Sequence, residues 1–233
     1  MKTVGFKKFG DPEVLEVMEF PDNEIGSEDI KIKNYASAVN PTDIVSRSGL
    51  IKHFIKDFSL PCVPGMDFAG IVEEVGENVK TGVKVGDSVM GMVMPNGIHG
   101  AYSDRLILNQ FAVVKIPKNT SFIEAATLPM NGLTARLSLD LLNLKKGQTI
   151  AVTGGPGAYG GYVIQLAKAD GLIVVADSYE SDIKLLKDLG VDHIIPRGKN
   201  FVEEIKKKFP EGVDGIADGA LLNENAIGAV KDN

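Results

Sequence analysis

Cysteine is almost absent from this chain of 233 residues, in which Cys62 is the single one. One thiol excludes an intramolecular disulfide and a structural zinc lobe built from four cysteines. It suits a reducing compartment, so the cytoplasm is the expected location. Histidine is scarce too. His53, His99 and His193 lie in unrelated segments without metal-ligand spacing, and we interpret them as surface or loop residues.

Long apolar runs are also missing. No stretch approaches the roughly 20 apolar residues that span a bilayer, and the N-terminus has no apolar run of signal-peptide length. A formal net charge of -6 argues against a general nucleic-acid binder, which needs a basic face. No basic amphipathic stretch indicates a membrane surface. What remains is an ordinary soluble globular composition, long enough for two modest domains.

Glycine, in contrast, is concentrated after one short apolar run. The run Thr149–Thr153 is followed by Gly155-x-Gly157-x-x-Gly160 and then by a helix-patterned segment. This order of strand, glycines and helix is the dinucleotide-binding fingerprint. Its glycines allow a tight turn, a close approach of a pyrophosphate and helix–strand packing, and the helix N-terminus attracts phosphate. A plain glycine-rich turn is the alternative. The predicted cofactor contacts are Gly155, Gly157, Ala158, Tyr159 and Gly160.

Residues 1–118 carry many short β-type runs separated by glycine and proline turn signals. The pattern predicts a barrel-like all-β domain without a long helix. The expected strands are Lys2–Phe6, Leu15–Phe20, Asp29–Ala38, Asp67–Val75, Ser88–Met92 and Tyr102–Leu108.

Residues 119–146 are predicted to form a helical connector. Ser121 and Glu124 form a capping-box pattern, and apolar positions recur at helical spacing from Gly132 to Leu142. From 147 to 233 strands and helices alternate, which predicts parallel βαβ units. The expected strands are Thr149–Thr153, Leu172–Ala176, His193–Ile195 and Gly215–Ala217. The expected helices follow Gly157 and cover Ser181–Leu189 and Asn200–Phe209, and the last strand leads to a final segment, Glu224–Lys231.

Several stretches are more specific than turns. They are Asn40–Gly49, Leu60–Gly76, Val85–Val89, Leu128–Ala135 and Gln165–Lys168. In this order they resemble the medium-chain dehydrogenase/reductase superfamily over essentially the whole chain. The resemblance implies an α/β fold, with an N-terminal GroES-like β-barrel-type catalytic domain and a Rossmann doubly wound parallel sheet.

Two positions decide the branch of this family. Zinc alcohol dehydrogenases hold catalytic zinc with a Cys and a His where this chain has Asn40 and Met66, and neither residue offers a thiolate or an imidazole. We therefore expect no metal. The chain is more similar to the zinc-free quinone oxidoreductase branch, the zeta-crystallin-like proteins. This implies hydride transfer from NADPH to a small-molecule quinone or α,β-unsaturated carbonyl, with Thr134 facing the cofactor cleft.

Asn40 and Asp43 are the catalytic candidates. The Asn40 amide can donate to a developing enolate or hydroquinone oxygen, and the resemblance also places it near the nicotinamide. A local ion pair between Asp43 and Arg47 that holds the loop is the alternative for those two residues. The family often has tyrosines where this chain has Val45 and Ile51, which predicts a more apolar pocket and leaves the acceptor open.

The choice between NADPH and NADH depends on the residues at the end of the second strand of the βαβ segment. Asp177 lies 22 residues after Gly155, where an acid takes the ribose of NAD. The family's spacing places Ser178 at the position that contacts the 2′ group of the ribose, and a small hydroxyl there tolerates a 2′-phosphate. Asp182 replaces the family's phosphate-binding lysine. Arg197 either grips the phosphate in two-pronged fashion or is a solvated loop charge. NADPH is favoured, with NADH as the alternative.

A doubly wound sheet has six strands, and the sequence predicts four before Asn233. The resemblance implies that relatives continue for roughly another 80–100 residues, enough for the two further strands. We expect an exposed fourth strand and no family-type homodimer interface, which forms through the sixth strand. Either the chain is a fragment or truncated product, or it is a nucleotide-binding protein with little or no turnover.

Overall fold

The computed structural model describes residues 1–54 and 58–232. The chain forms two compact units, Met1–Met130 and Asn131–Asn233. The sequence predicts a division into domains at 1–118, 119–146 and 147–233, and this division stays a prediction. Besides its α-helices, the chain has short 3-10 helices at Pro12–Val14, Leu50–His53, Gln110–Ala112 and Glu180–Asp182.

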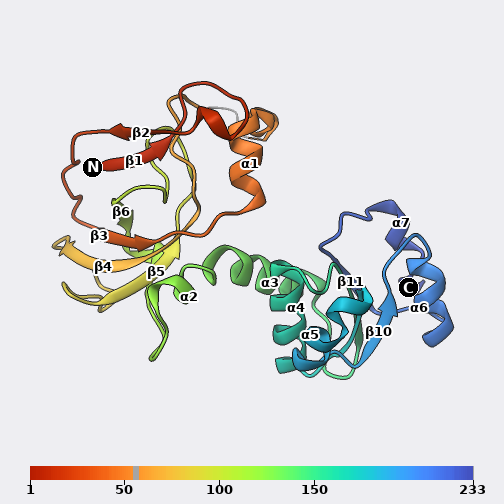
Figure 1. The fold of residues 1–233 in the computed structure, drawn as a ribbon. Coiled ribbons are helices and arrows are strands. Elements are labelled where there is room, and N and C mark those ends of the chain that lie inside the picture. The colour runs from red at the N-terminus through yellow and green to blue at the C-terminus, as the bar shows by residue number, and fades with distance from the viewer. Residues whose placement is uncertain (55–57, 233) are drawn as a thin grey trace. The chain divides into compact units, whose positions relative to one another are not determined.

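The first unit is built on antiparallel strands. They are β1 (Lys2–Gly5), β2 (Glu16–Glu19), β3 (Asp29–Ala36), β4 (Asp67–Val75), β5 (Ser88–Met92), β6 (Arg105–Asn109) and β7 (Val113–Lys115). Five of them form a curled sheet in the order β6-β3-β4-β5-β7, and β1 pairs with β2 (Figure 1). Ile30 and Ile32 point from alternate positions of β3 into one core with Phe68. Alternate residues of β3 are therefore buried, as in a strand that has one face on the core.

The six predicted strands of this half are present, while β7 and one helix were missed. Helix α1 (Pro41–Ser48) begins after Asn40 and ends at Gly49, whose φ is 87°. Both ends have good local signals: proline at the first helical position and glycine at the last cap. No long helix was expected here, and α1 has only eight residues. The short helix itself was not predicted, because eight residues are too few to establish an apolar period.

The connecting segment is helical, as predicted. Helix α2 (Phe122–Ala125) has the expected capping box: Glu124 donates its N–H to the Ser121 hydroxyl at 3.3 Å and its carboxylate accepts from the Ser121 N–H at 2.9 Å. Helix α3 (Pro129–Leu142) starts three residues before the predicted Gly132.

The second unit is a parallel sheet with helices on both faces. Its elements are β8 (Thr149–Thr153), α4 (Ala158–Ala169), β9 (Ile173–Ser178), α5 (Ile183–Asp188), β10 (His193–Pro196), α6 (Phe201–Lys208), β11 (Gly215–Asp218) and α7 (Glu224–Ile227). The strands lie in the order β10-β9-β8-β11, so the third, second, first and fourth strands are neighbours. This is the order of a doubly wound sheet, and the predicted fold class is confirmed.

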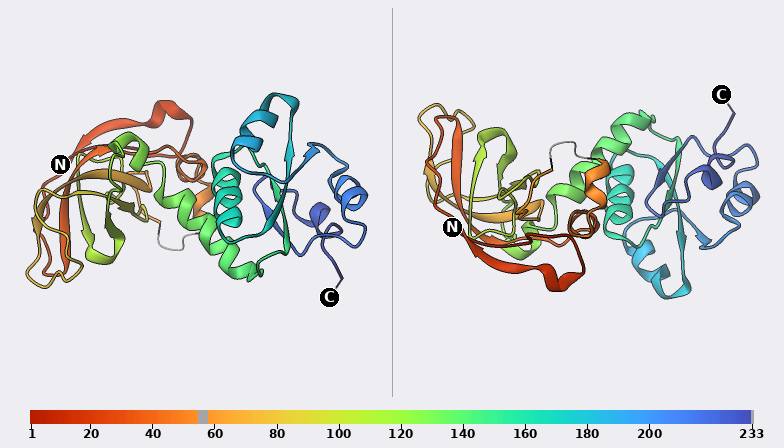
Figure 2. Two further views of the ribbon diagram at one scale, coloured as in Figure 1. Left: turned by 90° about the horizontal axis from the view of Figure 1, so that it is seen from below. Right: turned by 90° about the horizontal axis from the view of Figure 1, so that it is seen from above.

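Burial on both faces of this sheet explains its unbroken apolar strands. Ile150 and Val152 pack into the core beneath α3 and α4. Ala151, between them in sequence, packs on the opposite side with Phe201 of α6. Figure 2 shows α4 and α6 on opposite faces of the sheet. Every residue of β8 is consequently buried, and the strand delivers the glycine segment to the carboxyl edge of the sheet.

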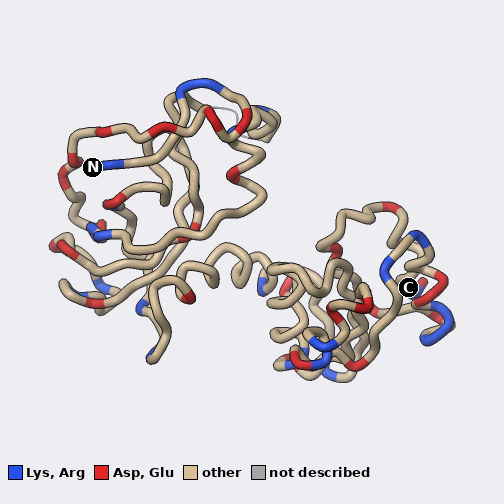
Figure 3. The backbone as a smooth tube through the Cα atoms, viewed as in Figure 1, with Lys and Arg blue, Asp and Glu red and all other residues tan. Residues whose placement is uncertain are grey.

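Charges of both signs are interspersed over both units (Figure 3). In the part of the chain that the structure describes, no helix has the length and apolarity needed to cross a bilayer.

Candidate functional site

The glycine segment makes a tight turn at the end of β8. Gly154 adopts φ +66°, a left-handed conformation that favours glycine. Its N–H donates to Asp177 Oδ1 at 2.6 Å, and its carbonyl accepts from the Gly157 N–H at 2.9 Å. The sequence predicts a tight turn at the fingerprint glycines, and the structure places the left-handed residue of this turn at Gly154, one position before the first of them, Gly155.

The three fingerprint glycines then have distinct surroundings. A Cβ on Gly155 would lie 3.0 Å from the Cβ of Ala176, so this glycine packs against β9. A Cβ on Gly160 would lie 2.9 Å from the Cα of Gly155, so this one holds α4 against the turn. A Cβ on Gly157 would meet only the Gly154 carbonyl oxygen, at 3.1 Å. Bare backbone therefore faces outward at Gly157, the N-cap of α4, and suits a phosphate group.

A cavity of about 500 Å³ opens beside this turn. Its lining includes Asp177, Tyr179, Arg197, Lys199, Leu222 and Asn225. The Arg197 guanidinium carbon lies 5.3 Å from the centre of the Tyr179 ring, a cation–π contact. Two cations, an amide and apolar side chains can together hold a nucleoside that carries a phosphate. Lys199 and Asn225 were missed by the sequence analysis; a second cation two residues after Arg197 was the available signal for Lys199.

The side chains at the end of β9 make hydrogen bonds and an ion pair with neighbouring residues of the chain. Asp177 is 3% exposed; one carboxylate oxygen accepts from Gly154 and the other lies 3.8 Å from Arg197 Nε. The Ser178 hydroxyl donates to the Tyr179 carbonyl at 2.7 Å. Asp177 is thus tied to the glycine turn.

Asn40 lies in the first unit, in a buried polar cluster. Its side-chain amide donates to Asp67 Oδ2 at 2.6 Å. Asp67 is fully buried, and its other oxygen accepts from the Met130 N–H at 2.6 Å. Burial raises the pKa of Asp67 and the nearby charge of Asp43 adds to this, while the two donors oppose it. Asp67 stands directly after Met66 in the sequence, but it was not among the predicted site residues.

Asp43 joins three segments of the first unit. Its carboxylate accepts from the N–H groups of Asn40 at 2.8 Å and Gly65 at 2.9 Å, and from the Tyr102 hydroxyl at 3.1 Å. Burial raises the pKa of the Tyr102 hydroxyl, and the Asp43 charge reinforces the shift. Arg47 does not form the alternative ion pair considered above; its guanidinium donates to the Gly10 carbonyl.

The metal-ligand question concerns the same loops. Met66 Sδ accepts from the Thr42 hydroxyl at 3.3 Å. Cys62 is buried, and burial followed by the Asp43 charge raises the pKa of its thiol to about 12. Within residues 1–54 and 58–232, no three His, Cys, Asp or Glu side chains come together in a group that could hold a metal ion.

The predicted site residues divide between the units. Asn40 and Asp43 belong to the first, and the glycine turn, Ser178, Arg197 and Thr134 to the second. Thr134 lies on α3, where its carbonyl accepts from the Ser138 hydroxyl at 2.8 Å.

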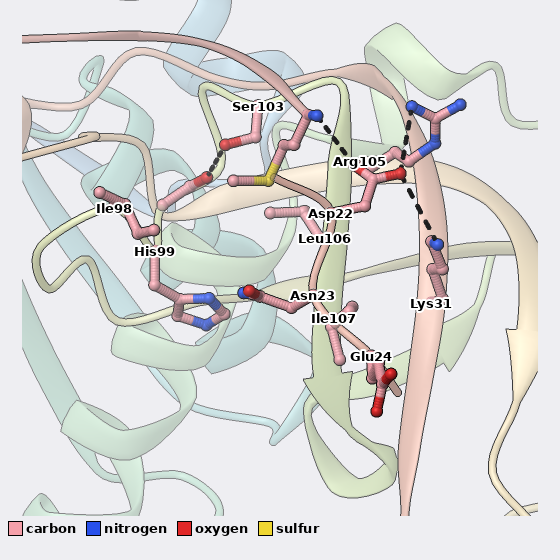
Figure 4. A pocket seen from close by; sticks show the side chains of 12 residues that line it. Asp22, Asn23, Glu24, Lys31, Ile98, His99, Ser103, Arg105, Leu106 and Ile107 are labelled. Carbon is pink, nitrogen blue, oxygen red and sulfur yellow. Dashed lines mark hydrogen bonds and ion pairs between the residues drawn. The ribbon is translucent and has the colours of Figure 1, made fainter. Parts of the chain in front are cut away.

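A second cavity, of about 210 Å³, lies in the first unit (Figure 4). Its charged groups face one another. Asp22 pairs with the Met1 amino group at 2.8 Å and lies 3.9 Å from Lys31 and 3.8 Å from Arg105. Because each of these three cations already faces the Asp22 carboxylate, we assign no ligand to this cavity.

A glycine turn at the carboxyl edge of a doubly wound sheet, with a cation-lined cavity beside it, defines a dinucleotide-binding class of protein. Comparisons with known families narrow the class. Residues 26–118 match the family described as "Alcohol dehydrogenase GroES-like domain", and residues 158–227 match "Zinc-binding dehydrogenase".

Individual relatives agree with these family matches. The chain is 36% identical to a 2-methylene-furan-3-one reductase of Solanum lycopersicum and 31% to a chloroplastic NADPH-dependent alkenal/one oxidoreductase of Arabidopsis thaliana, with 100% of this chain and 60% of each relative covered. A quinone oxidoreductase structure from Coxiella burnetii superposes with a TM-score of 0.83 at 30% identity, over 99% of this chain and 73% of that one. The chain belongs to the medium-chain dehydrogenase/reductase superfamily. It spans about 60% of the length of the two curated relatives.

Proposed function

We propose that this protein reduces a quinone or an α,β-unsaturated carbonyl with NADPH, without a metal ion. The glycine turn, with outward-facing backbone at Gly157 beside a cavity lined by Arg197 and Lys199, carries the proposal. The relatives described above, a quinone oxidoreductase and two enone-type reductases, support the acceptor class. The single buried cysteine supports a cytoplasmic location.

The choice of NADPH over NADH follows from charge. In NAD enzymes an acid at the end of the second strand accepts from the ribose 2′-hydroxyl. Here the Asp177 carboxylate already accepts from Gly154 and faces Arg197. Arg197 and Lys199 line the same cavity, and a 2′-phosphate offers each of them a charge-assisted hydrogen bond.

When bound, the dinucleotide would supply a hydride, and solvent would supply the proton that completes the reduction. The protein's own part is to bind and orient the reactants. We propose that the glycine turn and α4 hold the pyrophosphate, and that the Asn40 amide hydrogen-bonds the acceptor oxygen as charge develops there. Asp67 fixes the orientation of this amide through its 2.6 Å hydrogen bond. Asp43 serves as a positioning residue, because donors from three segments already occupy its oxygens.

Titration calorimetry with NADPH and NADH tests the nucleotide. We expect NADPH to bind more tightly, and Arg197→Gln to weaken NADPH by roughly tenfold, the worth of one charge-assisted hydrogen bond, with little effect on NADH. Lys206→Gln on α6 is the matched control, an exposed cation that does not line the cavity. Equal loss of both nucleotides in Arg197→Gln would contradict the proposed phosphate contact.

Loss of NADPH absorbance in the presence of a panel of quinones and enones tests the reaction. Oxidation of NADPH with at least one acceptor is the expected result. Tight binding without oxidation by any acceptor would instead favour the alternative, a nucleotide-binding protein with little or no turnover.

A further inference from the structure

The ring of Tyr159 lies against the end of β11. A Cβ placed on Gly219, the residue after this strand, would lie 2.9 Å from Tyr159 Cδ1 and 3.4 Å from Cε1. The Tyr159 hydroxyl donates to Ser138 Oγ on α3 at 2.8 Å. The ring is therefore held at both ends, by Gly219 beneath it and by Ser138 at its tip. All three residues belong to the second unit.

This position coincides with the topological switch point of the sheet. Strands β9 and β10 extend from one side of β8, and β11 lies on the other. Ligands of doubly wound sheets bind outside the carboxyl ends of the strands, in the crevice where the order reverses. The floor of that crevice is main chain: a Cβ on Gly154 would lie 3.2 Å from the carbonyl carbon of Gly219.

Hydrogen bonds pin this floor. The Thr153 hydroxyl donates to Asp218 Oδ1 at 2.5 Å and accepts from the Ala220 N–H at 3.0 Å. The end of β11 is thereby tied to the end of β8, so that the backbone has little freedom to move away from the Tyr159 ring. The space above Gly219 becomes available only if the side chain of Tyr159 rotates and gives up its bond to Ser138.

We propose that Tyr159 is a specificity-determining residue that fills the part of the crevice directly above Gly219, between the ends of β8 and β11, so that the adenosine half of the dinucleotide supplies most of the binding. The inference rests on the proposed function. The phosphate-bearing nucleoside occupies the cavity around Arg197, which is lined by residues at and after the ends of β9, β10 and β11 but not by Tyr159. The nicotinamide half of the dinucleotide has to extend past Gly157 toward β11, where the Tyr159 ring occupies the space.

Tyr159→Val tests the proposal with two ligands, NADPH and 2′,5′-ADP, each measured by titration calorimetry. Valine removes the ring and its hydroxyl, so NADPH should bind on the order of tenfold more tightly, the size of effect that one steric contact brings to a pocket. The affinity for 2′,5′-ADP should not change. The matched control is Tyr35→Val on β3 in the first unit, which should alter neither ligand.

The outcomes separate the two proposals. Normal 2′,5′-ADP binding with unchanged or weaker NADPH binding in Tyr159→Val would overturn the role of Tyr159 alone. Failure of the unaltered protein to bind 2′,5′-ADP would overturn the proposed function and this inference with it. If the valine variant does not fold, Ser138→Ala releases the ring tip without removing any ring atom, and a gain in NADPH affinity without a gain for 2′,5′-ADP is again expected; no gain would overturn the inference.

Discussion

The side-chain amide of Asn40 donates to the carboxylate of Asp67 at 2.6 Å, and the same carboxylate accepts from the backbone of Met130 at 2.6 Å. These bonds join the start of α1, the start of β4 and the start of α3. Asp67 is fully buried, so its charge is tolerable only because donors surround it. The residue proposed to contact the acceptor thus depends for its orientation on a carboxylate 27 positions away in the sequence.

Asp67→Asn should destabilise the protein. An amide keeps the shape of the carboxylate, but its NH2 group then faces one of the two donors, leaving a buried donor unsatisfied. We expect the free energy of unfolding to fall by about 1–3 kcal/mol, measured by urea denaturation. The control is Asp188→Asn, which breaks an exposed pair with Lys184 and should change stability by less than about 1 kcal/mol. Equal effects of the two variants would refute the assigned role of the buried carboxylate.

The pH dependence of stability should have opposite signs at Asp67 and Asp218. Burial raises the pKa of Asp67 above 3.8, so its contribution to stability is fully present below that value and is lost as the pH rises through the folded-state pKa. Burial also pushes the pKa of Asp218 upward, but hydrogen bonds from Thr153 and from the backbone of Asn223 outweigh it, and the pKa is lowered from 3.8. Its contribution is present above that value and is lost as the pH falls through the folded-state pKa.

Urea denaturation of the unaltered chain and of Asp67→Asn and Asp218→Asn, from about pH 3 to about pH 7, measures these contributions. With rising pH, the stability difference between the unaltered chain and Asp67→Asn should shrink. For Asp218→Asn the difference should grow. Slopes of the same sign in both variants would show that one of the two pKa shifts has the wrong direction.

Valine at the second and third fingerprint glycines should separate binding from folding. In Gly160→Val the new side chain meets the backbone of Gly154 and Gly155, so we expect a loss of stability of about 1–3 kcal/mol or more from overpacking. In Gly157→Val it meets only one carbonyl oxygen, and stability should fall by no more than about 1 kcal/mol, as for an altered helix cap. NADPH binding should nevertheless be lost in Gly157→Val, because the side chain occupies the place of the pyrophosphate. Calorimetry and thermal unfolding test both; normal NADPH binding by Gly157→Val would place the nucleotide elsewhere.

Cys62 should be unreactive in the folded protein. It is fully buried, and its thiol pKa is raised to about 12, whereas thiol reagents attack an accessible thiolate. Ellman's reagent should therefore react slowly with the native chain and with one thiol per chain in urea. Complete reaction under native conditions within the mixing time would show that the Cys62 environment opens readily.

The β8–α4 segment was predictable because its signals are local. Five buried residues in a row, a glycine cluster and a helix-patterned segment follow one another within about one βαβ half-unit. The same holds for the capping box of Ser121 and Glu124, which lies within a single turn. Helix α1 had local signals as well, at Pro41 and Gly49, but its apolar period was too short to stand out.

The chemistry of the first unit was decided by tertiary structure. Asn40 and Asp43 were candidates from the resemblance, yet what their side chains contact depends on Asp67, Gly65 and Tyr102, which β-sheet pairing brings to them from distant positions. No spacing in the sequence indicates that Asp43 accepts from two other segments in place of pairing with Arg47.

The sequence by itself determined the order of strands and helices and the place of the glycine turn, because these depend on local backbone preferences and on periods of burial. Tertiary structure alone decided which carboxylates are engaged. Asp177 is tied to Gly154, and the Tyr159 ring covers Gly219, because parallel strands far apart in sequence end at the same edge of the sheet. Hydrogen bonds and ring contacts made across that edge depend on differences in atomic position of a few tenths of an ångström, which the order of residues does not specify.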